Sequence, residues 1–104
     1  MPFVLFVRAK SDLDEAELER RLQERKPKFL EVSGLAQKVY GKDKTTGAVC
    51  GIYFFETKEA LGRFAESELA KTIPTAYEVT EIRKEVYEVL YPLRPGRGPL
   101  TDWD

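Results

Sequence analysis

The sequence predicts a single α+β domain in which two helices cover one face of an antiparallel sheet. The segment Ala48–Glu56 (AVCGIYFFE) is apolar on both faces of a strand, which is typical of a central strand. A second doubly apolar strand, Phe3–Ala9, opens the chain, and a helical pattern follows each of the two. The resulting order, β-α-β-β-α-β, is the split βαβ or ferredoxin-like arrangement.

The first helix is expected to cover about Leu13–Arg25. Asp12 begins a D-x-x-E variant of the capping box, and the acidic residues that follow suit the positive end of the helix dipole. Pro27 is expected to kink or restart the helix, because it lacks the N–H that would bond Gln23. Phe29, Leu30 and Val32 are expected to finish its apolar stripe, which Ser33-Gly34 ends. The charged run Glu15–Lys28 is interpreted as a solvated helix face.

The second half of the chain begins with the strand Leu35–Gly41 (LAQKVYG). A polar turn, KDKTTG, then leads into the central strand, which indicates an antiparallel hairpin. A second helix is expected over Thr57–Ser67, with Thr57 as its N-cap and its apolar residues on one face. A further short helical piece is expected over Glu68–Ile73, stopped by Pro74.

The last strand is expected at Arg83–Leu90, within the segment Val79–Tyr91. We expect residues 1–93 to form the single ferredoxin-like domain. Residues 94–104 are expected to be an extended or disordered C-terminal tail, because they are rich in proline and glycine.

Composition excludes several classes of function. The net charge of −1 and pI of about 5.6 give no pull toward nucleic acid or an anionic membrane, so neither is expected as a partner. The chain has no histidine, which excludes Ser-His-Asp and Cys-His catalysis, histidine-ligated zinc and a proximal-histidine haem. Neither a metal nor a cofactor is expected. One cysteine and a short N-terminal apolar run, Phe3–Val7, indicate a cytoplasmic protein.

The doubly apolar strands also predict an assembly. Two helices can cover only one face of the sheet, yet the first and third strands are apolar on both faces. An uncovered face of that composition would be an unusually large apolar patch for a soluble monomer. We therefore expect a homodimer, with the two sheets packed face to face around a barrel-like core.

Three segments resemble the YdhR-like monooxygenase family. Gly34–Tyr40 (GLAQKVY) resembles its GL-x-x-K-x-[YW] strand, and Thr46–Ala60 resembles its TG-x-x-x-GIY-[LF]-[FW]-[ED]-x-x-EA segment. Ser67–Ala70, with Ile73-Pro74 and Ala76-Tyr77, is similar to its post-helix segment. The resemblance covers nearly all of residues 2–93 and implies a dimeric α+β barrel of the antibiotic-biosynthesis-monooxygenase type.

One residue departs from the family pattern: Cys50 stands where a glycine or another small residue is expected before Gly51. The departure is modest, because cysteine is small and packs as an apolar residue. Cys50 is interpreted as structural, since no base or cation nearby in sequence would generate its thiolate.

The resemblance implies oxidation of a small aromatic or hydrophobic compound without metal or flavin, in which the substrate anion gives electrons directly to oxygen. The candidate substrate-binding residues are Lys38, Tyr40 and Tyr53, in a pocket between sheet and helices. Each has a simpler interpretation: Lys38 as an edge-strand lysine reaching solvent, and the two tyrosines as core or interface aromatics. No catalytic residue is assigned.

Two other functions fit parts of the sequence. The first is a non-catalytic small-molecule-binding or interaction dimer, since the chain holds no strong catalytic constellation. The second is an RNA-recognition domain, which shares the order of elements and carries stacking aromatics on its first and third strands. Cys50 stands before Gly51 where that class has Lys or Arg, and Ala9 stands near the end of the first strand where asparagine is usual. These differences argue against RNA binding.

Overall fold

Four antiparallel strands form the sheet of the computed structural model, which describes residues 2–96. The elements are β1 (Phe3–Ser11), α1 (Glu15–Leu30), β2 (Leu35–Lys42), β3 (Val49–Phe55), α2 (Lys58–Ala65), α3 (Glu68–Lys71), α4 (Ile73–Ala76) and β4 (Val79–Glu88). The strands lie in the order β2-β3-β1-β4. This is the predicted ferredoxin-like α+β arrangement, with α3 and α4 as further short helices.

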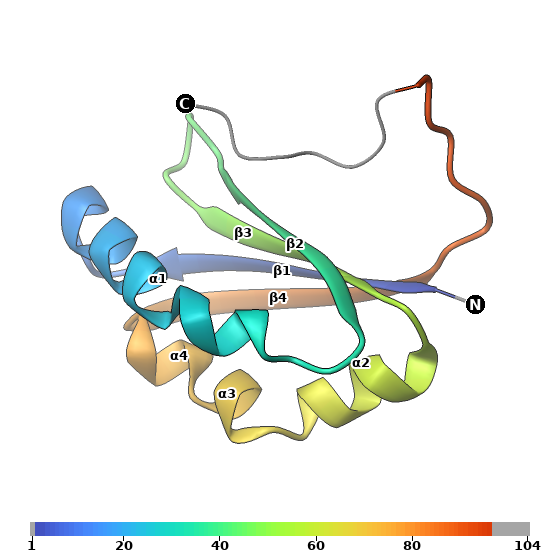
Figure 1. The fold of residues 1–104 in the computed structure, drawn as a ribbon. Coiled ribbons are helices and arrows are strands. Elements are labelled where there is room, and N and C mark those ends of the chain that lie inside the picture. The colour runs from blue at the N-terminus through green and yellow to red at the C-terminus, as the bar shows by residue number, and fades with distance from the viewer. Residues whose placement is uncertain (1, 97–104) are drawn as a thin grey trace.

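β1 and β3 are the two inner strands, as their doubly apolar sequences predict. They pair with each other with Leu5 opposite Tyr53, and β4 pairs with the other edge of β1. β2 completes the predicted hairpin on the far side of β3, where Lys38 lies opposite Tyr53. The helices lie on one face of the sheet (Figure 1). Lys38 therefore shares the helix-covered face with Tyr53, because directly opposed residues point to the same side.

The core fills the space between this sheet face and the helices. Leu5 and Val7 of β1 and Tyr53 and Phe55 of β3 supply its floor. The helices and the turn after α4 contribute Leu18, Phe29, Ala60, Leu61, Phe64, Ile73 and Tyr77. Tyr53 and Phe55 are the largest fully buried side chains of the described chain, so the central strand is also the centre of the core.

The other sheet face is not covered by any helix of residues 2–96. Alternation along the strands directs Val4 and Phe6 of β1, and Ile52 and Phe54 of β3, to this face. All four keep some contact with solvent, and Phe54 is 37% exposed. We call these four residues, with their neighbours on the same side, the open face.

α1 begins later than predicted and continues through the expected break at Pro27. Its N-cap is Asp14 rather than Asp12, and the Asp14 carboxylate accepts a hydrogen bond of 2.9 Å from the backbone N–H of Glu17. The helix also runs through Pro27 to Leu30 without a restart. Burial of Phe29 in the core stabilises this last turn despite the N–H that Pro27 lacks.

Thr57 caps α2 as predicted, but the elements after α2 differ from the prediction. Pro74 does not stop a helix: it lies in the first turn of α4, where the absent N–H has no intrahelical partner to lose. β4 begins at Val79 and ends at Glu88 instead of spanning Arg83–Leu90. Its early half is exposed and polar on the sheet edge, so hydrophobic alternation does not indicate it. The predicted tail lies mostly outside the described residues.

Among the described residues, none of the helices has the length and apolar character that crossing a membrane requires.

Candidate functional site

Lys38 is enclosed by aromatic rings on the helix side of β2. Its Nζ lies 3.4 Å from the ring centroid of Phe29, 4.3 Å from that of Tyr40 and 4.5 Å from that of Tyr53. Within residues 2–96 no hydrogen bond or ion pair engages this amine. We call Lys38 and these three rings the Lys38 cage. The amine keeps its hydrogen-bonding capacity for a ligand.

The glycine at position 51 leaves room for the Lys38 cage. A Cβ atom there would lie 3.1 Å from Cε1 of Tyr53 and 3.2 Å from Cε of Lys38, closer than ordinary van der Waals contact. Gly51 therefore makes the room in which the lysine chain lies against the tyrosine ring.

Burial favours the uncharged form of the Lys38 amine. Burial first, and then the nearby positive charge of Arg25, lower the pKa of Lys38 to about 7. The ring faces of the cage oppose this shift, because they attract the ammonium form. With its pKa near neutrality, Lys38 can accept a proton at physiological pH, which a solvent-exposed lysine with a pKa near 10.4 rarely does.

Tyr40 and Tyr53 contact this amine, and both of them, like Tyr77 beside Arg25, stay protonated at neutral pH. Burial raises the pKa of Tyr40 to about 12, and it also raises the pKa values of Tyr53 and Tyr77. The negative charge that Tyr77 would carry as a phenolate contributes to the rise in the pKa values of Tyr40 and Tyr53. At neutral pH each is a hydrogen-bond donor for an oxyanion.

Arg25 is the second cation of this region, and the sequence interpretation missed it. It belongs to the run Glu15–Lys28 that was expected to be a solvated face, but α1 directs it toward α3 and α4. Its Nη2 donates to the backbone oxygen of Leu69 at 3.2 Å and to Oγ1 of Thr72 at 3.0 Å. The spacing of Leu18, Leu22, Arg25 and Phe29 on one helical stripe was the signal that could have revealed it.

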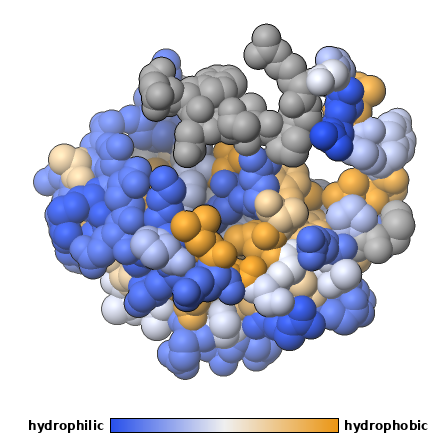
Figure 2. Space-filling model, viewed as in Figure 1, coloured by the Kyte–Doolittle hydropathy of each residue, from blue (hydrophilic) through white to orange (hydrophobic). Residues whose placement is uncertain are grey.

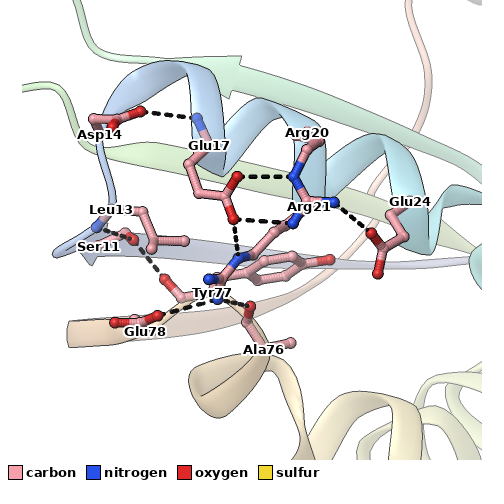
Figure 3. A network of polar contacts seen from close by, with 10 residues as sticks. All are labelled: Ser11, Leu13, Asp14, Glu17, Arg20, Arg21, Glu24, Ala76, Tyr77 and Glu78. Carbon is pink, nitrogen blue, oxygen red and sulfur yellow. Dashed lines mark hydrogen bonds and ion pairs between the residues drawn. The ribbon is translucent and has the colours of Figure 1, made fainter.

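Tyr77, which the sequence interpretation also left without a role, is fixed at the junction of α4 and β4. Its backbone oxygen accepts a hydrogen bond from Oγ of Ser11. On its two sides, Arg21 donates to the backbone oxygen of Ala76 at 3.2 Å and pairs with the carboxylate of Glu78 at 3.2 Å (Figure 3). These contacts hold the Tyr77 ring beneath α1, with 6% of the residue exposed.

A cleft of about 820 Å³ opens beside the Lys38 cage, between α1 and the β2–β3 hairpin. Leu18, Leu22 and Val49 supply apolar lining, whereas charged residues form much of the remainder. In Figure 2 the surface over α1 is hydrophilic, and hydrophobic side chains gather beside it near the middle of the view. The cleft has the size and mixed lining of a small-molecule site.

The structure brings the three predicted site residues together, but only one of them lines the cleft. Tyr40, which is 37% exposed, lines the cleft and also contacts the Lys38 amine. Lys38 and Tyr53 lie behind it and do not line the cleft. Cys50 is partly buried on the opposite sheet face, away from the cage. Within residues 2–96 no group of three or more Cys, Asp or Glu is arranged to hold a metal ion.

This arrangement suits the binding of a small anion in an apolar setting. Lys38 and Arg25 supply positive charge, the tyrosines supply O–H donors, and no carboxylate of residues 2–96 forms an ion pair with either cation. Both cations are partly shielded from water, which favours pairing with an opposite charge, so a ligand oxyanion would complete the site.

Solved structures share this fold. A putative antibiotic biosynthesis monooxygenase from Deinococcus radiodurans is 13% identical, with a TM-score of 0.71 over 90% of this chain and 97% of that chain. A variant of SnoaB, a cofactor-independent oxygenase from Streptomyces nogalater, is 13% identical, with a TM-score of 0.74 over 88% and 96%. A protein of unknown function from Nitrosomonas europaea is 19% identical, with a TM-score of 0.73 over 92% and 96%.

At these identities the solved structures support the fold alone. Assignment to a family depends on sequence comparison. No curated protein is similar enough to match. The family model described as putative mono-oxygenase ydhR, in contrast, matches residues 4–95. This match spans both the central hairpin and the Lys38 cage, in agreement with the motifs in Gly34–Tyr40 and Thr46–Ala60. The chain belongs to the ydhR mono-oxygenase family.

Proposed function

We propose that this protein is a cofactor-independent monooxygenase that acts on a small aromatic compound in the cytoplasm. The observation that carries the proposal is the Lys38 cage: a partly buried amine, without a hydrogen bond or ion pair to residues 2–96, surrounded by three aromatic rings. Family membership supports the oxygenase chemistry, and the solved relative described as a cofactor-independent oxygenase supports the absence of a cofactor.

The substrate would reach Lys38 through the cleft. Tyr40 stands between the cleft and the amine, on a strand at the edge of the sheet. A turn of its side chain toward solvent would join the two spaces. The substrate ring would then take the place of the Tyr40 ring against Lys38 and pack on Phe29.

In this scheme Lys38 acts as the base. The neutral amine takes a proton from an acidic O–H or C–H group of the substrate, and the resulting ammonium pairs with the substrate anion. The hydroxyl group of Tyr53, which stays in the cage, donates a hydrogen bond to the same anion, because its raised pKa keeps it protonated. Burial strengthens each of these interactions by excluding water.

The electrons for oxygen come from the substrate itself. In a phenolic compound with an activated methylene group, the anion gives electrons to O₂ and the carbon becomes a carbonyl. The balance is R₂CH₂ + O₂ → R₂C=O + H₂O. The carbon loses four electrons and gains one oxygen atom, and the second oxygen atom leaves as water with both methylene hydrogens. No external reductant is consumed.

The proposed assembly is a homodimer formed through the open face. The support is the apolar character of Val4, Phe6, Ile52 and Phe54 on a face that no helix of residues 2–96 covers. Packing two such faces together would bury them in one core and give the barrel-like dimer that the sequence predicts.

The test of the oxidation is oxygen uptake with a hydroxyanthrone, which combines phenol groups with an acidic methylene. Wild-type protein is expected to consume oxygen and form the quinone, and Lys38→Met is expected to lower the rate at least tenfold. Lys84→Met, at an exposed position on β4, is the matched control and should keep the wild-type rate. Binding without oxygen uptake by wild-type protein would contradict the proposal and favour a non-catalytic binding dimer.

A further inference from the structure

Arg25 and Tyr77 form a second polar site beneath α1, next to the Lys38 cage. The guanidinium carbon of Arg25 lies 5.5 Å from the ring centroid of Tyr77. Nε of Arg25 and the hydroxyl oxygen of Tyr77 are both buried and make no well-formed hydrogen bond within residues 2–96, although the guanidinium lies close enough to the phenol to oppose the rise of its pKa. The Tyr77 hydroxyl points along α1 toward its C-terminal half, which carries Arg25 (Figure 3).

Two unsatisfied donors in one buried place are costly. A buried polar group without a partner costs about 1–3 kcal/mol, and more when it is charged. Here the charge of Arg25 also opposes the ammonium form of Lys38. A negatively charged acceptor would relieve both effects at once.

A hollow of about 350 Å³ between α1 and the end of α4 also reaches Arg25. It is lined by Arg20, Arg21, Glu24, Arg25, Lys28 and Ala76. Arg20 is engaged by Glu17 and Glu24, and Arg21 by Glu17 and Glu78, whereas Arg25 and Lys28 form no ion pair within residues 2–96. Four basic residues and one acidic residue around one hollow raise the local concentration of anions.

We propose that Arg25 and Tyr77 bind a carboxylate group of the substrate, so that the substrate is a hydroxylated aromatic acid. One carboxylate has two oxygen atoms and can accept one hydrogen bond from Nε–H of Arg25 and another from O–H of Tyr77. Its ring would extend toward the Lys38 cage, with its hydroxyl group at the amine. This inference rests on the proposed function, since it places the phenol at Lys38 and adds an anchor for the acid.

The test compares acids with their neutral amides. The probes are 4-hydroxybenzoate and 6-hydroxy-2-naphthoate, each with the matching carboxamide, and the measurement is the Kd by calorimetry at pH 7. Wild-type protein is expected to bind at least one acid tenfold or more tightly than its amide. Arg25→Gln and Tyr77→Phe are expected to raise the Kd of the acid several-fold more than that of the amide, because the amide carbonyl loses a weaker, uncharged hydrogen bond, so the preference for the acid shrinks.

Arg20→Gln is the matched control: it lines the same hollow, but its guanidinium is already held by Glu17 and Glu24, so the preference for the acid should remain. Tyr77→Phe keeps the buried ring, so this variant is expected to stay folded. Thermal unfolding checks that it does. Equal Kd values for acid and amide in wild-type protein would overturn the proposal, as would an undiminished preference in Arg25→Gln. The two proposals can be told apart. If acid and amide bind equally well and Lys38→Met abolishes binding of the amide, this inference fails but the proposed function stands. Absence of binding by all four probes would contradict both.

Discussion

At the scale of single residues, the molecule places a lysine, an arginine and a tyrosine at the margin of an apolar core that contains two further tyrosines. The lysine motif in Gly34–Tyr40 and the tyrosine of GIY made Lys38, Tyr40 and Tyr53 predictable as candidates, because strand alternation places them on one sheet face. Arg25 and Tyr77 were not predictable in the same way. Their approach depends on how α1 and α4 pack, and this is a tertiary contact between residues distant in the sequence.

The shifted pKa of Lys38 predicts a specific dependence of stability on pH. In the unfolded chain this lysine stays protonated up to about pH 10.4, whereas in the fold its pKa is about 7. Between these values the unfolded state binds more protons, so the free energy of unfolding rises with pH, by up to about 1.4 kcal/mol per pH unit.

Lys38→Met removes this titration and keeps an unbranched apolar chain in the cage. Urea unfolding between pH 7 and pH 9 should show wild-type protein gaining stability relative to Lys38→Met as the pH rises. Lys84→Met, at an exposed position, should follow wild-type protein. Parallel pH profiles for wild-type protein and Lys38→Met would mean that the amine is not shifted by the fold.

At the scale of elements, the turn between α1 and β2 sets how closely α2 packs. Gly34 has a φ of +80°, and a Cβ atom there would lie 2.4 Å from Cβ of Ala60 in α2. Gly47 has a similar φ of +77°, with no atom within 4 Å of such a Cβ. The two glycines therefore separate the cost of backbone conformation from the cost of a clash.

Gly47→Ala is expected to lower the free energy of unfolding by about 1–2 kcal/mol, from the left-handed backbone alone. Gly34→Ala is expected to lower it by a further 1–3 kcal/mol or so, because the new methyl group must displace α2. Urea unfolding at one pH measures both. Equal losses at the two positions would show that α2 does not pack against this turn.

Element types and order followed from the sequence, but several boundaries did not. The doubly apolar patterns fixed β1 and β3, and Thr57 marked the start of α2. α1 continues through Pro27, where a break was expected, because burial of the Phe29 side chain stabilises the helical turn that follows. β4 began earlier than predicted because pairing with β1, rather than its own apolar pattern, holds its first residues in the sheet.

At the scale of the whole molecule, the open face predicts self-association. Native mass spectrometry at micromolar concentration should give the mass of two chains. Ile52→Lys places a charge on this face and should raise the dissociation constant of the dimer at least a hundredfold, because a buried unpaired charge is costly. Lys84→Met leaves the face unchanged and should remain dimeric. A single-chain mass for wild-type protein would contradict the sheet-to-sheet dimer.

The central claim is that the Lys38 cage binds an aromatic compound as its anion, and the ionisation of a bound phenol tests it most directly. A nitrophenol is suitable, since its anion absorbs visible light that tyrosine does not. Bound to wild-type protein, its pKa is expected to fall by about one unit or more below that of the free compound, because an ammonium beside a phenol favours the anion. Bound to Lys38→Met, its pKa should rise above the free value, because burial without a cation favours the neutral phenol. An unchanged or raised pKa on wild-type protein would contradict the account.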